Sequence, residues 1–133
     1  MAQTVFDSLD EVRAAVGRRL GVSDWLEITA DRLGGFAAAT GDRDHVHLAL
    51  ALTNLFLPQV VEVRGASLGV NYGTGSVRFG APLRAGTRVR GTAELAACDE
   101  IAGGVQTTIL ITVEVEGADR PACVVESLSR WLA

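Results

Sequence analysis

The residues best suited to acid–base chemistry lie in one short stretch, Gly41-Asp42-Arg43-Asp44-His45-Val46-His47. This stretch holds both of the histidines in the chain, and His47 follows Asp42 by five positions. A carboxylate and an imidazole five positions apart can act together in general acid–base catalysis. The structural alternative is that Asp42 merely follows the end of one helix while the histidines cap the next. Spacing alone leaves both interpretations open.

The two cysteines, Cys98 and Cys123, do not resemble nucleophiles. Each lies in a strand-like pattern with no activating base nearby in the sequence, so we interpret both as small core residues. Two separated cysteines do not make a disulfide framework, which indicates a reduced, intracellular protein.

The composition predicts a single globular domain over residues 1–133. The chain is 48% hydrophobic and 21% charged, and its net charge of −4 comes with no basic run, which argues against a nucleic-acid partner. The N-terminus does not resemble a signal peptide, and the longest apolar stretch, residues 48–57, is about half the length of a membrane span. We therefore expect a soluble cytoplasmic protein that does not interact with membranes.

The N-terminal residues 1–21 are expected to form an extension built on an amphipathic helix. Ser8 and Glu11 have the spacing of a capping box, and Gly21 is expected to end the helix. The residues predicted to face the core are Val12, Ala15, Val16 and Leu20.

Two further helices are predicted before the chain changes character. Thr29 is expected to cap a helix over residues 30–39, which Gly41 ends. Residues 48–57 are apolar almost all round and lack β-branched runs, which is typical of a buried helix.

Strand patterns fill the second half of the chain. Apolar and polar residues alternate strictly over residues 105–116 and over residues 88–97, and residues 122–131 begin apolar on both faces. Shorter extended pieces are expected over residues 67–72 and 77–79. Helices followed by antiparallel strands indicate an α+β fold in which the sheet wraps the buried helix.

Motifs occur in a characteristic order over nearly the whole chain from Ser23 onwards. Together they resemble the MaoC-like, (R)-specific enoyl-CoA hydratase family of the hotdog superfamily. The stretches that carry the resemblance are residues 23–29, Phe36-Ala37-Ala38-Ala39-Thr40-Gly41-Asp42, Asn71-Tyr72-Gly73, Val77-Arg78-Phe79, Ala81-Pro82-Leu83, Gly86, and residues 115–117 with 121–124.

The resemblance implies a hotdog fold, in which a curved antiparallel sheet wraps one central helix, and a homodimer that joins two sheets. It also implies a lyase that reversibly hydrates trans-2-enoyl-CoA, or the acyl-carrier-protein thioester, to the (3R)-hydroxyacyl product. No metal or redox cofactor is implied, because the thioester itself makes C3 electrophilic.

The resemblance also assigns roles to the acid–base stretch. An Asp and a His five positions later hold the reacting water in the family, which implies Asp42 as the base and His47 as the group that orients the water or shuttles the proton. The reverse assignment stays open. Backbone N–H groups near His47 and Leu48, at the start of the buried helix, are expected to stabilise the oxyanion.

One departure from the family pattern separates two registers. In the family, the catalytic His is followed by an Asp, a loop rich in Gly, Pro and Ala, and a His-Gly pair that opens the buried helix. Here His47 runs straight into Leu48, so a segment is missing. In the first register His47 is catalytic; in the second, His45-Val46 replaces the His-Gly pair and the catalytic His is absent.

The missing segment leaves other functions open. If the chain is continuous and truly shortened, we expect an uncovered site with weak or no hydratase activity. The alternatives are a non-catalytic hotdog subunit that dimerises or binds acyl chains, and a hotdog acyl-CoA thioesterase. Side chains of Asp42 and His47 that point to different sides would favour the non-catalytic subunit.

The strand pattern leads to a prediction about assembly. In a monomer, the alternating strands over residues 88–97 and 105–116 would leave an exposed edge. Because closed two-fold assembly is the commonest way to cover such an edge, we predict a homodimer.

Overall fold

The computed structural model describes residues 3–133, and its central feature is a six-stranded, mainly antiparallel sheet. The strands run in the order β2-β6-β7-β8-β5, and the short strand β3 also pairs with β6. Their bounds are β2 (Arg19–Val22), β3 (Leu26–Glu27), β5 (Leu68–Phe79), β6 (Arg88–Ile101), β7 (Gly104–Val115) and β8 (Cys123–Leu132).

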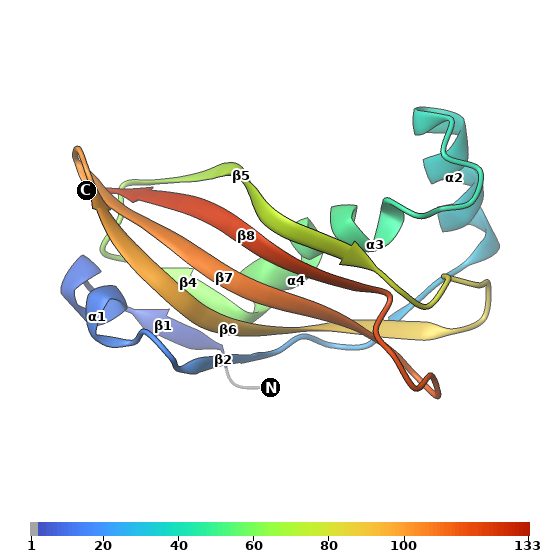
Figure 1. Cartoon of the computed structure of the whole chain (residues 1–133), viewed down its shortest axis with the longest axis horizontal. Helices are drawn as coiled ribbons and strands as arrows, with labels where there is room; N and C mark the ends of the chain where they lie inside the picture. Colours follow the sequence, from blue (N-terminus) through green and yellow to red (C-terminus); the bar gives the residue numbers. More distant parts are fainter. Residues whose placement is uncertain (1–2) are drawn as a thin grey trace.

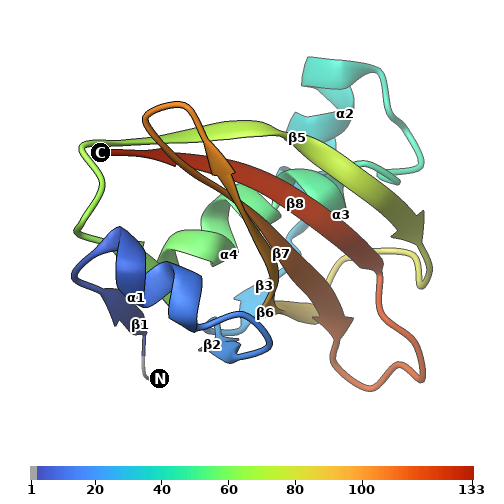
Figure 2. The same ribbon diagram turned by 60° about the vertical axis from the view of Figure 1, so that its left-hand side comes forward.

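Four helices accompany this sheet, and α3 and α4 pack against one of its faces. They are α1 (Leu9–Ala14), α2 (Ala30–Thr40), α3 (Leu48–Ala51) and α4 (Thr53–Val60), and a separate parallel pair joins β1 (Thr4–Phe6) to β4 (Val61–Val63). Figures 1 and 2 show the long strands curving around α3 and α4, which occupy the concave side. This arrangement confirms the expected hotdog fold.

The alternating sequence explains the curved sheet. Along β7, every second residue from Val105 to Val113 is buried, and the residues between them are half-exposed. The buried residues face the helices and the residues between them face outward, because successive side chains of a strand point to opposite sides. The predicted strands over residues 88–97, 105–116 and 122–131 are confirmed to within a few residues, whereas the two short pieces over 67–79 form one strand, β5, interrupted by two register shifts.

The central helix packs closely on the sheet at one point. Phe56, on α4, is only 1% exposed, and its ring lies over Gly91 of β6. A Cβ atom placed on Gly91 would come within 2.8 Å of the Phe56 side chain, so only glycine permits this approach.

The buried helix differs from its prediction in two ways. It extends through Pro58 to Val60 and is divided at Leu52 into α3 and α4. It is also not buried all round, because Leu55 is 44% exposed. One side of α4 therefore lacks a partner within the chain.

The N-terminal helix is shorter than the sequence predicts. Ser8 caps it as expected, but the helix ends after Ala14 and Gly17 takes a positive φ of 91°. Gly17 then donates its N–H to the carbonyl of Leu95 at 2.7 Å, which turns the chain into β2. The predicted core residue Leu20 is buried on that strand, whereas Val16 is 49% exposed, so its assignment to the core is wrong.

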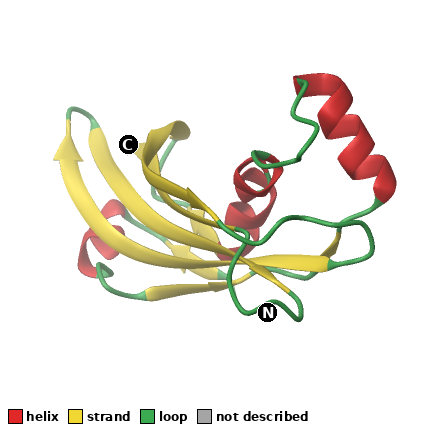
Figure 3. Cartoon of the chain, turned by 45° about the vertical axis from the view of Figure 1, so that its right-hand side comes forward, coloured by secondary structure: helices red, strands yellow, loops and turns green. Residues whose placement is uncertain are grey.

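Helix α2 agrees with its prediction at both ends. The Thr29 hydroxyl accepts the N–H of Arg32, and Gly41 ends the helix in the left-handed conformation with φ 76°. None of its side chains is fully buried, and Figure 3 shows the helix projecting away from the sheet. Asp42 therefore lies directly after the C-terminal cap of this projecting helix.

The argument from exposed edges was wrong about the strands involved. β6 and β7 lie inside the sheet and are paired on both sides. The long strand with an open edge is β5, twelve residues in length, of which Leu68 and Tyr72 are each 54% exposed. β5 is therefore the long strand whose open edge a homodimer would cover.

We predict that Gly91→Ala lowers the free energy of unfolding by about 1–3 kcal/mol, because its methyl group overlaps the Phe56 ring. Urea denaturation measures the change. The matched control is Gly34→Ala on α2, where an added Cβ meets nothing within 4 Å. It should be neutral or stabilise by about 0.5–1 kcal/mol. Equal effects of the two substitutions would contradict the close packing of α4 on β6.

Candidate functional site

The connection between α2 and α3 is a continuous pair of short turns. The N–H of His45 donates to the carbonyl of Asp42 at 3.3 Å, and the N–H of Leu48 donates to the carbonyl of His45 at 3.3 Å. His45 adopts a positive φ of 59°, the only non-glycine residue among those described to do so. The chain thus passes from Asp42 to Leu48, the first residue of α3, through two short turns.

The turns bring Asp42 and His47 into contact. The backbone N–H of His47 donates to Oδ2 of Asp42 at 2.8 Å, and Nδ1 of its ring lies 3.3 Å from the same oxygen. The Asp42 side chain is 18% exposed and that of His47 is 65% exposed. The two side chains therefore face each other, and the imidazole is accessible to solvent.

The backbone contact controls the charge of Asp42. The N–H of His47 that donates to the carboxylate, helped by the N–H of Val46 and the His47 ring, lowers the pKa of Asp42 below its usual value. Asp42 is consequently ionised at neutral pH. An ionised carboxylate against Nδ1 favours the tautomer with a proton on Nδ1, which leaves Nε2 free to accept one.

This geometry combines the two interpretations of the sequence. Asp42 does accept backbone N–H groups at the start of a helix, as the structural alternative supposes. It also contacts the His47 ring, as the catalytic interpretation requires. The contact of 3.3 Å leaves no room for a water molecule between Nδ1 and Oδ2, so a bound water must lie beside the pair.

The expected oxyanion donors are already occupied. The N–H of His47 donates to Asp42, and the N–H of Leu48 donates to His45. The prediction that these two groups stabilise an oxyanion is therefore wrong for this conformation. The next N–H along the helix, that of Ala49, has no acceptor among the described residues.

A phenylalanine that sequence reasoning did not single out completes the site. The ring of Phe79, at the end of β5, meets the His47 ring edge to face with 5.2 Å between centroids. Phe79 also lines a pocket of about 150 Å³, whose lining includes neither Asp42 nor His47. Phe79 belongs to a motif that supported the family resemblance, but nothing in that motif indicates contact with His47.

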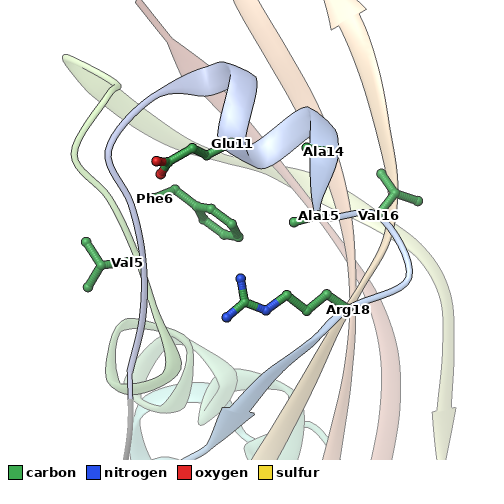
Figure 4. A pocket seen from close by; sticks show the side chains of 7 residues that line it. All are labelled: Val5, Phe6, Glu11, Ala14, Ala15, Val16 and Arg18. Atoms are coloured by element: carbon green, nitrogen blue, oxygen red, sulfur yellow. The ribbon is translucent and has the colours of Figure 1, made fainter.

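A larger pocket of about 430 Å³ lies at the other end of the molecule, between β1 and α1. Figure 4 shows Phe6 at its centre, with Glu11 and Arg18 on opposite sides. It contains neither Asp42 nor His47, so the acid–base pair lies outside it.

Residues 3–133 contain no group of three or more His, Cys, Asp or Glu side chains placed to hold a metal ion. None of their helices is both long and apolar enough to cross a membrane.

Comparison with known proteins places the chain among dehydratases. No family model matches it. It is 38% identical to 3-hydroxyacyl-thioester dehydratase Z of Mycobacterium tuberculosis, over 96% of this chain and 98% of that protein.

Two solved structures share the fold. One is an (R)-hydratase from A. caviae involved in PHA biosynthesis, with a TM-score of 0.66, 18% identity, and coverage of 87% of this chain and 96% of that one. The other is a MaoC-like dehydratase from Rhodospirillum rubrum, with a TM-score of 0.65, 15% identity, and coverage of 89% and 92%.

The mycobacterial relative is longer than this chain over the matched region. Since 96% of the 133 residues here is about 128, about 20 of the 148 matched positions have no counterpart in this chain.

We predict that Asp42 titrates below the usual range of aspartate, and that the shift largely survives in His47→Ala, because the backbone N–H causes most of it. Carboxyl carbon chemical shifts recorded against pH measure both values. A lowered pKa of Asp42 in the folded state stabilises the protein at pH values above the pKa that the same group has in the unfolded chain. That stabilisation is lost as the pH falls through the folded-state pKa. A normal pKa in His47→Ala would assign the shift to the ring instead.

Proposed function

Because the chain belongs to the MaoC-like hydratases of the hotdog superfamily and is an enzyme of the hydro-lyase type, we propose that it reversibly hydrates trans-2-enoyl thioesters. The substrate is an enoyl-CoA or the corresponding acyl-carrier-protein thioester, and the product is the (3R)-hydroxyacyl thioester. The observation that carries the proposal is the contact between Asp42 and the exposed His47 ring.

The geometry favours the reverse of the roles that the resemblance first implied. Asp42 is a weak base, because backbone N–H groups stabilise its ionised form. We therefore assign Asp42 to orienting the imidazole and His47 to the proton transfers. Nε2 of His47 takes a proton from water as the water oxygen bonds to C3. The same nitrogen then returns the proton to C2, which gives addition on one face.

The enolate that forms between these steps needs a hydrogen-bond donor at the thioester oxygen. The N–H of Ala49 is the candidate, since it donates to no acceptor among the described residues and Ala49 lies two residues after His47. The reaction as proposed requires no metal or redox cofactor, because the thioester carbonyl already polarises the double bond.

The short α2–α3 connection favours a second candidate. The His47 side chain is 65% exposed, so water reaches it freely. Exclusion of water strengthens the electrostatic interactions on which such catalysis depends. A subunit that binds acyl thioesters but turns them over weakly or not at all is therefore the alternative.

We propose that the protein works as a homodimer in the cytoplasm. The support for a dimer is the open edge of β5 and the exposed side of α4 next to it, which together carry Leu55, Leu68 and Tyr72. The support for a reducing compartment is that Cys98 and Cys123 are both unpaired.

Light scattering should give the mass of a dimer at micromolar concentration. Tyr72→Glu places a charge on the exposed face of β5 in both copies, and it should shift the protein toward monomer. Val16→Glu is the matched control, since Val16 is similarly exposed but lies between α1 and β2, outside both β5 and α4. A monomeric wild-type protein would contradict this part of the proposal.

Purified protein mixed with crotonyl-CoA should remove the ultraviolet absorbance of the enoyl thioester. His47→Ala should lower turnover by about 10²–10⁴-fold, the usual contribution of a general base. Asp42→Asn should lower it at least about tenfold with little change in Tm, because an amide can still accept the His47 N–H but stabilises an imidazolium poorly.

The control for these two variants is Asp31→Asn, an exposed carboxylate in the first turn of α2. It should retain wild-type turnover. If wild-type protein leaves crotonyl-CoA and longer enoyl thioesters unchanged, the hydratase proposal fails and the binding subunit replaces it. If His47→Ala keeps full activity, another group is the base.

A further inference from the structure

The His47 ring makes two directional contacts within residues 3–133. Nδ1 lies 3.3 Å from Oδ2 of Asp42, and the ring of Phe79 meets the imidazole at an interplanar angle of 68°, with 5.2 Å between centroids. The proposed function uses the contact with Asp42 and gives the contact with Phe79 no role. Because the His47 side chain is 65% exposed, these two contacts are its main restraints.

The contact with Asp42 does not by itself fix the angle of the imidazole. It joins one ring atom to one oxygen, and its 3.3 Å is longer than the usual N–H···O distance of about 2.7–3.2 Å. The same oxygen accepts the backbone N–H of His47 at 2.8 Å, which is the shorter of the two contacts. Rotation of a histidine ring about the bond that carries it has a broad energy minimum. The ring can therefore turn while the backbone hydrogen bond stays intact.

Phe79 offers the imidazole a surface that is held in place. It is the last residue of β5 and pairs in register with Cys123 of β8, which is 0% exposed. The next residue is held as well, since the N–H of Gly80 donates to the carbonyl of Ala122 at 2.9 Å. The centroid separation of 5.2 Å lies in the range of about 4.5–7 Å at which aromatic rings attract each other edge to face. This contact therefore restrains the tilt of the His47 ring.

We propose that Phe79 is a positioning residue, whose ring holds the His47 imidazole at the angle at which Nδ1 faces Asp42 and Nε2 faces the reacting water. This inference rests on the proposed hydratase function and adds a residue to it. Phe79 has no proton to give or take, so it acts only through His47. A displacement of about 1 Å at a reacting atom can cost about 100-fold in rate, and loss of the Phe79 ring permits a displacement of this kind.

A spectroscopic measurement tests the orientation without turnover. In a neutral imidazole, the hydrogen bonds of the ring decide which nitrogen carries the proton, and nitrogen chemical shifts recorded at alkaline pH report the two populations. His45→Asn leaves one histidine in the chain, and asparagine tolerates the positive φ of this position. In this background the proton should lie mainly on Nδ1 of His47, and Phe79→Leu should shift the population toward Nε2. Equal populations with and without the Phe79 ring would overturn the proposal.

The hydration of crotonyl-CoA tests the consequence for catalysis. Phe79→Leu keeps an apolar side chain but no ring, so kcat should fall about 10–100-fold while KM changes less than about twofold. Phe79→Tyr keeps the ring and should retain at least about half of the wild-type kcat. A rise in KM at unchanged kcat would make Phe79 a substrate-binding residue instead. Equal losses of kcat in the two variants would also contradict the positioning role.

The control for kinetics is Phe6→Leu, which makes the same exchange in the distant pocket of Figure 4. Phe6 is 3% exposed and Phe79 is 41% exposed, so Phe6→Leu should lower Tm more than Phe79→Leu while leaving kcat unchanged. Equal losses of kcat in Phe6→Leu and Phe79→Leu would assign the effect to general destabilisation. If wild-type protein hydrates no enoyl thioester, the hydratase function fails, and the proton populations of His47 still decide whether Phe79 orients the ring.

Discussion

The hydrogen bond from the backbone of His47 to the carboxylate of Asp42 is the contact on which the geometry of the site depends. It closes the connection between α2 and α3 across the two short turns. It also fixes which face of the carboxylate meets the imidazole, since the ring nitrogen approaches the same oxygen. One charge-assisted hydrogen bond thus sets the path of the chain, the ionisation of Asp42 and the orientation of His47.

The packing of α4 on the sheet fixes the point at which that connection must end. Because Gly91 lets Phe56 approach β6 closely, the position of α4 along the sheet is fixed by packing, and the start of α3 is fixed with it. The chain leaving Gly41 must then reach this point in few residues. The positive φ of His45 is the local conformation that allows it, which explains why a residue other than glycine is found in the left-handed region there.

The sequence contained enough information to predict the sheet and its central helix, because burial imposes periods of two and of about four residues on the chain. Thr29 and Gly41 likewise marked the ends of α2 through capping chemistry that is local in sequence. The failures concern contacts between distant segments. Gly17 ends α1 through a bond to Leu95, β5 is the open edge because of the order of strands, and Phe79 meets His47 across the fold. None of these contacts leaves a local pattern. The pairing of Asp42 with His47 was predictable from their spacing, whereas the direct contact between the ring nitrogen and the carboxylate was not.

Helix α2 contacts the core through the partly buried side chains of Leu33 and Phe36, and none of its side chains is fully buried. Sparse burial of this kind is typical of segments with low local stability, so we expect α2 to open before the sheet does. Asp42 follows the last turn of this unit, yet it is tied by hydrogen bonds to the first residues of the central helix instead. Fraying of α2 therefore leaves the carboxylate in place. The geometry of the pair therefore depends on the start of α3 rather than on the stability of α2.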